Sequence, residues 1–116
     1  MDFNIEPGII HSIEKTVEQE DTASSYGSGL IDVFATPAMI ALMENTAQSS
    51  LKAYLPDGYI TLGIEINVKH LKASPVGMKV RCESMLVKTD GKKLFFNLNA
   101  WDENTPLHYA IGLSSY

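Results

Sequence analysis

The chain has 116 residues, of which 45% are hydrophobic and 20% charged, a balance typical of a soluble globular domain. We expect residues 1–116 to form a single domain, because this length supports only one modest core. The net charge of −5 disfavours nucleic acid as a partner, since phosphate binding requires a basic surface. No apolar run approaches the roughly 18 residues that suggest a membrane span, and the N-terminus lacks the pattern of a secretory signal. A single cysteine excludes an internal disulfide, so a cytoplasmic protein is expected.

The first predicted strand covers residues 9–17, where Ile9, Ile13 and Val17 share one parity. A polar segment rich in serine and glycine follows at residues 18–29 and is typical of a mobile loop. The N-terminal part therefore predicts one strand and one loop ahead of the first long element.

A helix is predicted from Thr36 to Tyr54. Thr36 followed by Pro37 is a start signal, because threonine caps helix N-termini and proline is tolerated at the first helical position. The turn sequence at residues 56–58, PDG, predicts the end. The middle of the helix is apolar almost all round, which is typical of a helix covered on every side. Either a sheet curls around it or a second chain covers the rest, and both point to a wrapped helix in a dimer.

Four strands are predicted after the helix, joined by short turns. They cover residues 59–73, 78–88, 93–102 and 107–115. Turn residues stand between them at 74–77, at the Asp-Gly pair 90–91, and at 103–106. Short turns force antiparallel neighbours, so we expect a four-stranded meander facing one helix, in the α+β class.

Glu44 is the one charged side chain within residues 33–45, and no basic residue lies one helical turn away. A buried carboxylate without a partner has a raised pKa and is a candidate site residue. The alternative is an exposed glutamate on a solvent stripe that Gln48 and Lys52 continue at four-residue spacing. The pattern alone leaves both interpretations open.

Three further residues have both a structural and a functional interpretation. The hydroxyl of Thr36 would cap the helix and would also lie beside free N–H groups that stabilise negative charge. It is about 12 Å along the helix axis from Glu44, so the two side chains do not touch directly. His70 falls on the apolar parity of its strand, where core and catalytic histidines both occur. Gly63, inside a strand, indicates a bulge or the close approach of a ligand.

The remaining ionisable residues do not suggest metal chemistry. Three histidines and one cysteine show no metal-ligand spacing, so no metal site is expected. The sequence also lacks the glycine-rich phosphate-binding loops and the nucleophile elbow of other enzyme classes.

Three strings together resemble the hot-dog-fold thioesterases, and most closely their fluoroacetyl-CoA thioesterase-like branch. They are residues 33–44, residues 61–63, and residues 68–80, which read VKHLKASPVGMKV. The likeness covers roughly residues 5 to 115. It implies a hot-dog fold, in which an antiparallel sheet wraps one long central helix and two subunits pair edge to edge. It also implies an acyl-CoA thioesterase, present as a homodimer or a dimer of dimers, with CoA as part of the substrate and no separate cofactor.

The resemblance assigns a catalytic set. Thr36 matches the family's active-site hydroxyl, Glu44 its helix carboxylate and His70 its strand histidine. Glu44 would act as a general base on water or attack the thioester directly, and the sequence leaves both routes open. In the family the site forms at the dimer interface.

The resemblance also implies a substrate-binding set, namely Gly63, Leu30 and Phe34. Gly63 matches the glycine whose backbone N–H faces the thioester carbonyl. Fluoroacetyl-selective members carry an aromatic residue six positions before the threonine, where this chain has Leu30, so we do not expect fluoroacetyl selectivity. Many members carry Gly-x-His-x-Arg in the last strand, whereas this chain reads IGLSSY at 111–116, so no basic contribution is expected there. The remaining candidates for contacting CoA phosphates are Lys69, Lys72, Lys79 and Arg81.

Hydrolysis of a small acyl-CoA thioester is the function that these residues favour. The alternative is a non-hydrolytic acyl-CoA-binding or metabolite-sensing module on the same fold. A hot-dog hydratase is disfavoured, because that chemistry usually places an aspartate and a histidine about five residues apart and the helix contains no histidine.

Overall fold

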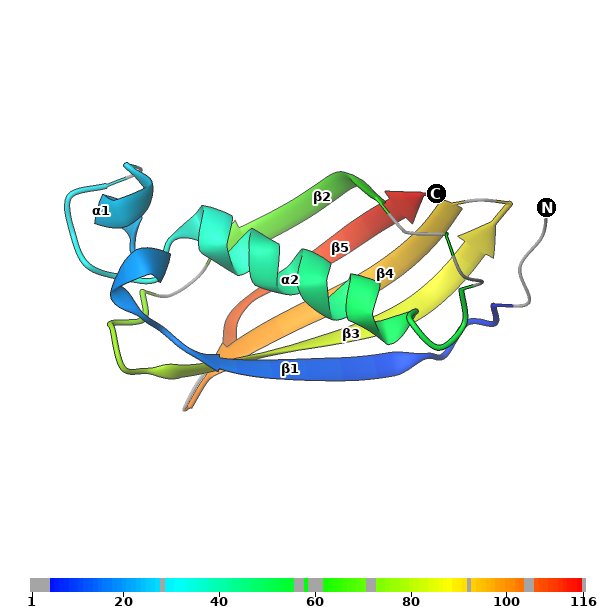
Figure 1. Ribbon diagram of the computed structural model, residues 1–116, viewed down its shortest axis with the longest axis horizontal. Helices are drawn as coiled ribbons and strands as arrows, with labels where there is room; N and C mark the ends of the chain where they lie inside the picture. The colour runs from blue at the N-terminus through cyan, green and yellow to red at the C-terminus, as the bar shows by residue number, and fades with distance from the viewer. Residues whose placement is uncertain are drawn as a thin grey trace.

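The computed structural model describes residues 5–27, 29–55, 58, 62–70, 73–91, 93–103 and 106–115, with backbone alone for 62–64, 70 and 106–115. In chain order the elements are β1 (Ile10–Thr16), the 3-10 turn η1 (Gln19–Asp21), α1 (Ala23–Tyr26), α2 (Thr36–Ser50), β2 (Leu62–His70), β3 (Lys79–Asp90), β4 (Lys93–Asp102) and β5 (Pro106–Ser115). The strands form one five-stranded sheet, and α2 lies across one of its faces (Figure 1). The predicted α+β class is confirmed.

The strands lie in the order β1-β3-β4-β5-β2, and each neighbouring pair is antiparallel. β3, β4 and β5 form the predicted meander, and Asp90 pairs with Lys93 across a turn in which Gly91 has a φ of 61°. The prediction of a four-strand meander is wrong for β2, which pairs with β5 instead of β3. β2 therefore forms one edge of the sheet and β1 the other.

The segment before β3 explains this error, because residues 74–77 read as a hairpin turn but belong to a crossover. Pro75 bridges Val33, and the carbonyl of Ser74 accepts the N–H of Phe34 at 2.7 Å. The N–H of Gly77 donates to the carbonyl of Val17 at 2.8 Å. These contacts anchor the segment to the residues before α2 and to the end of β1. The chain thereby passes from the β2 edge of the sheet to the opposite side.

The inner face of the sheet supplies the core under α2. Alternate residues of β3 and β4 are buried there, namely Val80, Cys82, Ser84, Leu86, Leu94, Phe96, Leu98, Ala100 and Asp102. This period of two is the signature of a strand with one buried face. α2 packs on β1, β2, β3 and β4, so most of the sheet contacts this helix.

The boundaries of α2 differ from the prediction at both ends. The N-cap is Ala35, which makes no side-chain capping bond, and Thr36 is the first helical residue, so the predicted threonine cap is wrong by one position. The helix ends at Ser50 instead of Tyr54, because the next N–H groups bond three residues back in tight turns. No helix within the described ranges is long and apolar enough to cross a membrane.

The polar segment between β1 and α2 contains regular structure, so the prediction of a mobile loop at residues 18–29 is wrong for the part described. The Oδ2 of Asp21 accepts the N–H of Glu18 at 2.9 Å, and its carboxylate pairs with Lys15 at 2.9 Å. Thr22 is buried and caps α1 by accepting the N–H of Ser25. Serine and threonine favour such capped turns as readily as open loops, which is why composition alone was misleading.

Candidate active site

The two sides of α2 differ in exposure. Its buried residues recur every three or four positions and are Ala38, Met39, Leu42, Met43, Thr46, Ala47 and Ser50. Glu44 lies on the opposite side and is exposed, as are Gln48 and Lys52. The interpretation that the chain's own sheet covers this helix on every side is therefore wrong, because a single sheet reaches one face only. Cover by a second chain stays a prediction.

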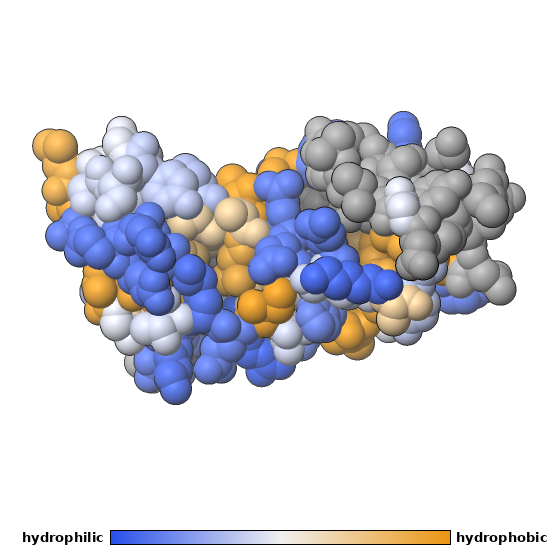
Figure 2. All heavy atoms as spheres, viewed as in Figure 1, coloured by the Kyte–Doolittle hydropathy of each residue, from blue (hydrophilic) through white to orange (hydrophobic). Residues whose placement is uncertain are grey.

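The exposed side of α2 presents the predicted hydroxyl and carboxylate to the surface. Thr36 and Glu44 are both exposed, and among the described residues Glu44 forms no hydrogen bond or ion pair. Figure 2 shows apolar side chains among polar ones on this face of the molecule. The two site residues remain about 12 Å apart along the helix axis, so α2 alone does not bring them together.

The other two predicted residues lie on the edge strand β2. The register of β2 on β5 shifts between Gly63 and Glu65, as expected for a bulge, which is one of the two alternatives that Gly63 indicated. At the rise of an extended strand, Gly63 and His70 lie about 23 Å apart. β2 runs in the opposite direction to α2 (Figure 1), so the end that carries His70 lies toward the start of the helix. Within one chain, therefore, the backbone at His70, and not that at Gly63, lies toward the Thr36 end of α2.

Sequence reasoning missed one residue beside this strand. The register places His108 of β5 directly opposite His70. The only signal would have been the pairing of β2 with β5, which the short-turn argument did not predict.

The two remaining substrate-binding candidates have opposite surroundings. Leu30 is 99% exposed, in the loop before α2. Phe34 is 1% exposed and belongs to the hydrophobic core. In the single chain, therefore, Leu30 is accessible at the surface, whereas Phe34 is part of the core just before α2.

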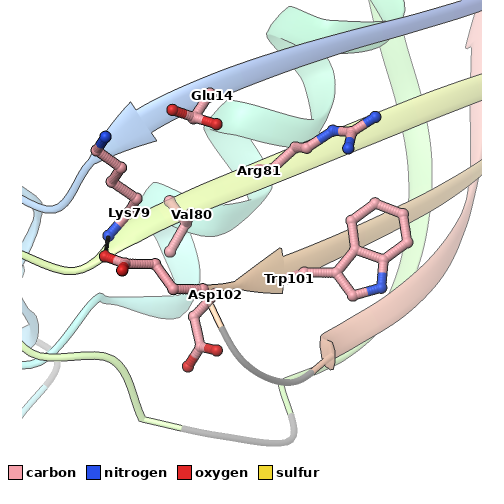
Figure 3. A pocket seen from close by; sticks show the side chains of 7 residues that line it. Glu14, Lys79, Val80, Arg81, Trp101 and Asp102 are labelled. Carbon is pink, nitrogen blue, oxygen red and sulfur yellow. Dashed lines mark hydrogen bonds between the residues drawn. The ribbon is translucent and has the colours of Figure 1, made fainter.

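A pocket of about 290 Å³ lies away from all of these residues, at the end of the sheet (Figure 3). Its lining includes Lys79 and Arg81, two of the candidates for contacting CoA phosphates. The Arg81 guanidinium lies 5.8 Å from the centre of the Trp101 ring, and the Lys79 N–H donates to Glu103 at 3.0 Å. Three carboxylates line the pocket against two cations, a balance that does not favour an anionic ligand. Of the other two candidates, Lys69 is exposed on β2, and Lys72 lies outside the described residues.

Cys82 is buried in the core below α2. Burial raises the pKa of its thiol to about 11. The thiol is therefore protonated at neutral pH and unsuited to nucleophilic chemistry. Across the described ranges, no three histidine, cysteine, aspartate or glutamate side chains gather as a metal-binding group.

The geometry of one chain does not identify a function, but the sequence matches a known protein family. Residues 17–110 match the profile of the fluoroacetyl-CoA-specific thioesterase family, and this range includes Thr36, Glu44, Gly63 and His70. The chain belongs to this family. The resemblance seen in the sequence is thus confirmed. The fluoroacetyl-CoA thioesterase of Streptantibioticus cattleyicolor is 35% identical over 71 residues, which are 61% of this chain and 51% of that protein. The match thus spans about half the length of this family member.

Solved structures confirm that this chain has the predicted hot-dog fold. A variant of the fluoroacetyl-CoA-specific thioesterase FlK, in complex with fluoroacetate and CoA, superposes with a TM-score of 0.89 at 25% identity, covering 96% of this chain and 94% of that one. A hot-dog-like protein from Thermanaerovibrio acidaminovorans superposes with a TM-score of 0.88 at 23% identity, covering 99% and 87%. The predicted sheet with one long central helix is therefore correct.

Proposed function

We propose that this chain hydrolyses a small acyl-CoA thioester to the free acid and CoA, at a site formed between two copies of the chain. The observation that carries the proposal is membership of the fluoroacetyl-CoA-specific thioesterase family over a range that includes every predicted catalytic residue. The similarity to a thioesterase crystallised with fluoroacetate and CoA supports a CoA thioester as the substrate class.

The side chains suit this reaction. A backbone N–H at Gly63 stabilises the oxyanion that forms when the thioester carbonyl is attacked, an interaction worth a few kcal/mol. Glu44 either takes a proton from the attacking water or attacks the carbonyl itself to form an anhydride that water then hydrolyses. In both routes the C–S bond breaks and the CoA thiolate leaves. His70 orients the carboxylate or protonates this thiolate, and Thr36 presents its hydroxyl at the helix start.

A second copy of the chain would bring a Gly63 and a His70 together. In one chain Gly63 and His70 lie at opposite ends of β2, about 23 Å apart. β2 is an edge strand with no partner on its outer side among the described residues. If two β2 edges pair antiparallel about a two-fold axis, the Gly63 end of one lies beside the His70 end of the other. The exposed side of α2, with Glu44, then faces a site to which both copies contribute.

The residue at position 30 suggests the acyl group. Leu30 is aliphatic and stands where fluoroacetyl-selective members carry an aromatic side chain. We infer a small, unsubstituted aliphatic acyl group in place of fluoroacetyl, because an exposed leucine contributes apolar contact of about 0.8 kcal/mol for each methylene that it covers.

Release of free thiol from a panel of acetyl-, fluoroacetyl-, butyryl-, branched and aromatic acyl-CoAs tests the activity. We expect Glu44→Gln to lose at least about tenfold in rate, or about 1.4 kcal/mol in the barrier. Glu14→Gln, an equivalent change on the outer face of β1, is the matched control and should retain full activity. Binding of acyl-CoA by calorimetry without turnover, unaffected by Glu44→Gln, would instead favour a non-hydrolytic binding module.

Mixed dimers test whether the site is shared. Gly63→Pro removes the N–H at a position where proline is tolerated, since edge strands and bulges accept it. A dimer of one Gly63→Pro copy and one Glu44→Gln copy, isolated with two different tags, should recover about half of the wild-type activity, because one of its two sites is intact. A dimer of Thr36→Ala and Glu44→Gln copies should recover none, because both changes lie on α2. An inactive first mixture would place the whole site within one copy.

A further inference from the structure

The loop that projects between residues 22 and 34, which includes α1, has its two ends joined by hydrogen bonds. The N–H of Ala23 donates to the carbonyl of Val33 at 2.8 Å, and Thr22 and Phe34 form an antiparallel bridge. One residue further on, the N–H of Ala35 donates to the carbonyl of Asp21 at 2.8 Å. These bonds fix both ends of the loop immediately before the first residue of α2.

The side-chain carboxylate of Asp32 accepts two further hydrogen bonds near the ends of this loop. Asp32 Oδ1 accepts the hydroxyl of Ser24 at 2.5 Å and the amide of Gln19 at 3.0 Å. These hydrogen bonds lower the pKa of Asp32 below its ordinary value, and the bond from Ser24 contributes more than the bond from Gln19. The carboxylate therefore remains charged in the neutral range. Asp32 therefore links η1 and α1 to the residues just before α2.

The loop held in this way carries exposed apolar side chains. Tyr26 is 48% exposed, Leu30 99% and Ile31 63%. Figure 1 shows α1 and this loop at the end of the molecule where α2 begins, and Figure 2 shows apolar atoms projecting at that end. A single exposed apolar side chain needs no explanation, but Leu30 and Ile31 directly precede the aspartate that anchors their loop.

We propose that Asp32 is a positioning residue for acyl-chain selectivity. Its bonds to Ser24 and Gln19 hold Leu30 and Ile31 beside the start of α2, where these side chains contact the aliphatic part of the acyl group. This proposal rests on the proposed function, because it concerns the substrate of that same site. Asp32 itself touches neither the substrate nor the reacting atoms.

Steady-state kinetics with acetyl-CoA and butyryl-CoA test the role. Asp32→Ala should raise KM for butyryl-CoA about fivefold, close to the effect expected when contact with about one methylene is lost, while kcat and the KM for acetyl-CoA stay within about twofold. Asp32→Asn keeps an acceptor oxygen for both donors and should behave as wild type. Ser24→Ala removes one donor and should give a smaller shift in the same direction.

A double mutant connects Asp32 to the side chains that it positions. Leu30→Ala should lower the preference for butyryl-CoA, and adding Asp32→Ala should lower it no further, because both act through one contact. Effects that simply multiply, or an unchanged butyryl-to-acetyl ratio in Asp32→Ala, would overturn the proposal. Glu14→Gln serves again as the control for a lost carboxylate.

Limited proteolysis separates this proposal from the proposed function. Chymotrypsin should cut after Tyr26 or Leu30 faster in Asp32→Ala than in wild type or Asp32→Asn, and this readout needs no enzymatic activity. Wild-type protein that hydrolyses no acyl-CoA would remove the proposed function and the selectivity role together. Normal hydrolysis with equal cleavage in all three proteins would remove the role of Asp32 alone.

Discussion

The two sides of α2 show how differently one helix can be used. The inner side packs Met39 and Met43 against the sheet with no exposed surface. The outer side carries Glu44 and Gln48, which are exposed and contribute little to the fold of a single chain. The inner side therefore supports the fold and the outer side carries the proposed function, and substitutions on each should separate the two.

The largest effect is expected from the inner side. Met39→Ala should destabilise the protein by about 2–5 kcal/mol, because it leaves a cavity that the packed sheet cannot fill. Gln48→Ala on the outer side should stay within about 0.5 kcal/mol. Urea unfolding at one protein concentration measures both. Similar losses for the two variants would mean that a partner chain buries the outer side as deeply as the sheet buries the inner one.

An alkaline titration examines the inner side through Cys82, which lies beside Thr46 of α2. Burial raises the pKa of the thiol from an ordinary 9.0 to about 11, so the unfolded chain ionises first. The stabilisation, about 3 kcal/mol, is complete below about pH 9 and is lost as the pH rises toward 11. Comparing the unfolding free energies of wild type and Cys82→Ala across this range isolates the thiol. Parallel curves for the two proteins would show that the thiol does not ionise differently on unfolding.

A substitution on the outer side of α2 should lower the activity and leave the stability almost unchanged. Glu44→Gln should leave the free energy of unfolding within about 0.5 kcal/mol, because the exposed carboxylate has no partner among the described residues. The same variant should lower the hydrolysis rate by at least about tenfold. Measured on one preparation, these values compare the two sides directly. A stable variant with full activity would leave Glu44 as an ordinary surface residue.

Much of this fold was predictable from local patterns. Alternation placed β1, β3 and β4 closely, and the Asp-Gly pair at 90–91 predicted a hairpin that is present. Both signals act over a few residues, through side-chain parity and the turn that glycine permits. The pairing of β2 was not predictable in this way, since residues 74–77 form a turn in either topology and only contacts with Val17, Val33 and Phe34 distinguish them.

The candidate site also has some features that the sequence predicted and others that depend on the folded structure. The strings at residues 33–44, 61–63 and 68–80, which carry the four predicted site residues in order, indicated the family, because a match of residue types along the chain requires no knowledge of distance. Whether Glu44 is buried, and whether Gly63 and His70 lie near each other, depends on which surfaces meet after folding. The bonds of Asp32 to Ser24 and Gln19 likewise join residues that no periodicity relates.

By itself, then, the sequence determined the long helix, the strands and the family, because each follows from residue type and spacing along the chain. The tertiary structure decided that β2 forms an edge, that Glu44 faces outward and that hydrogen bonds hold the loop carrying Leu30. These depend on contacts between distant segments, and their free energies are set by packing and hydrogen-bond geometry that local pattern does not encode.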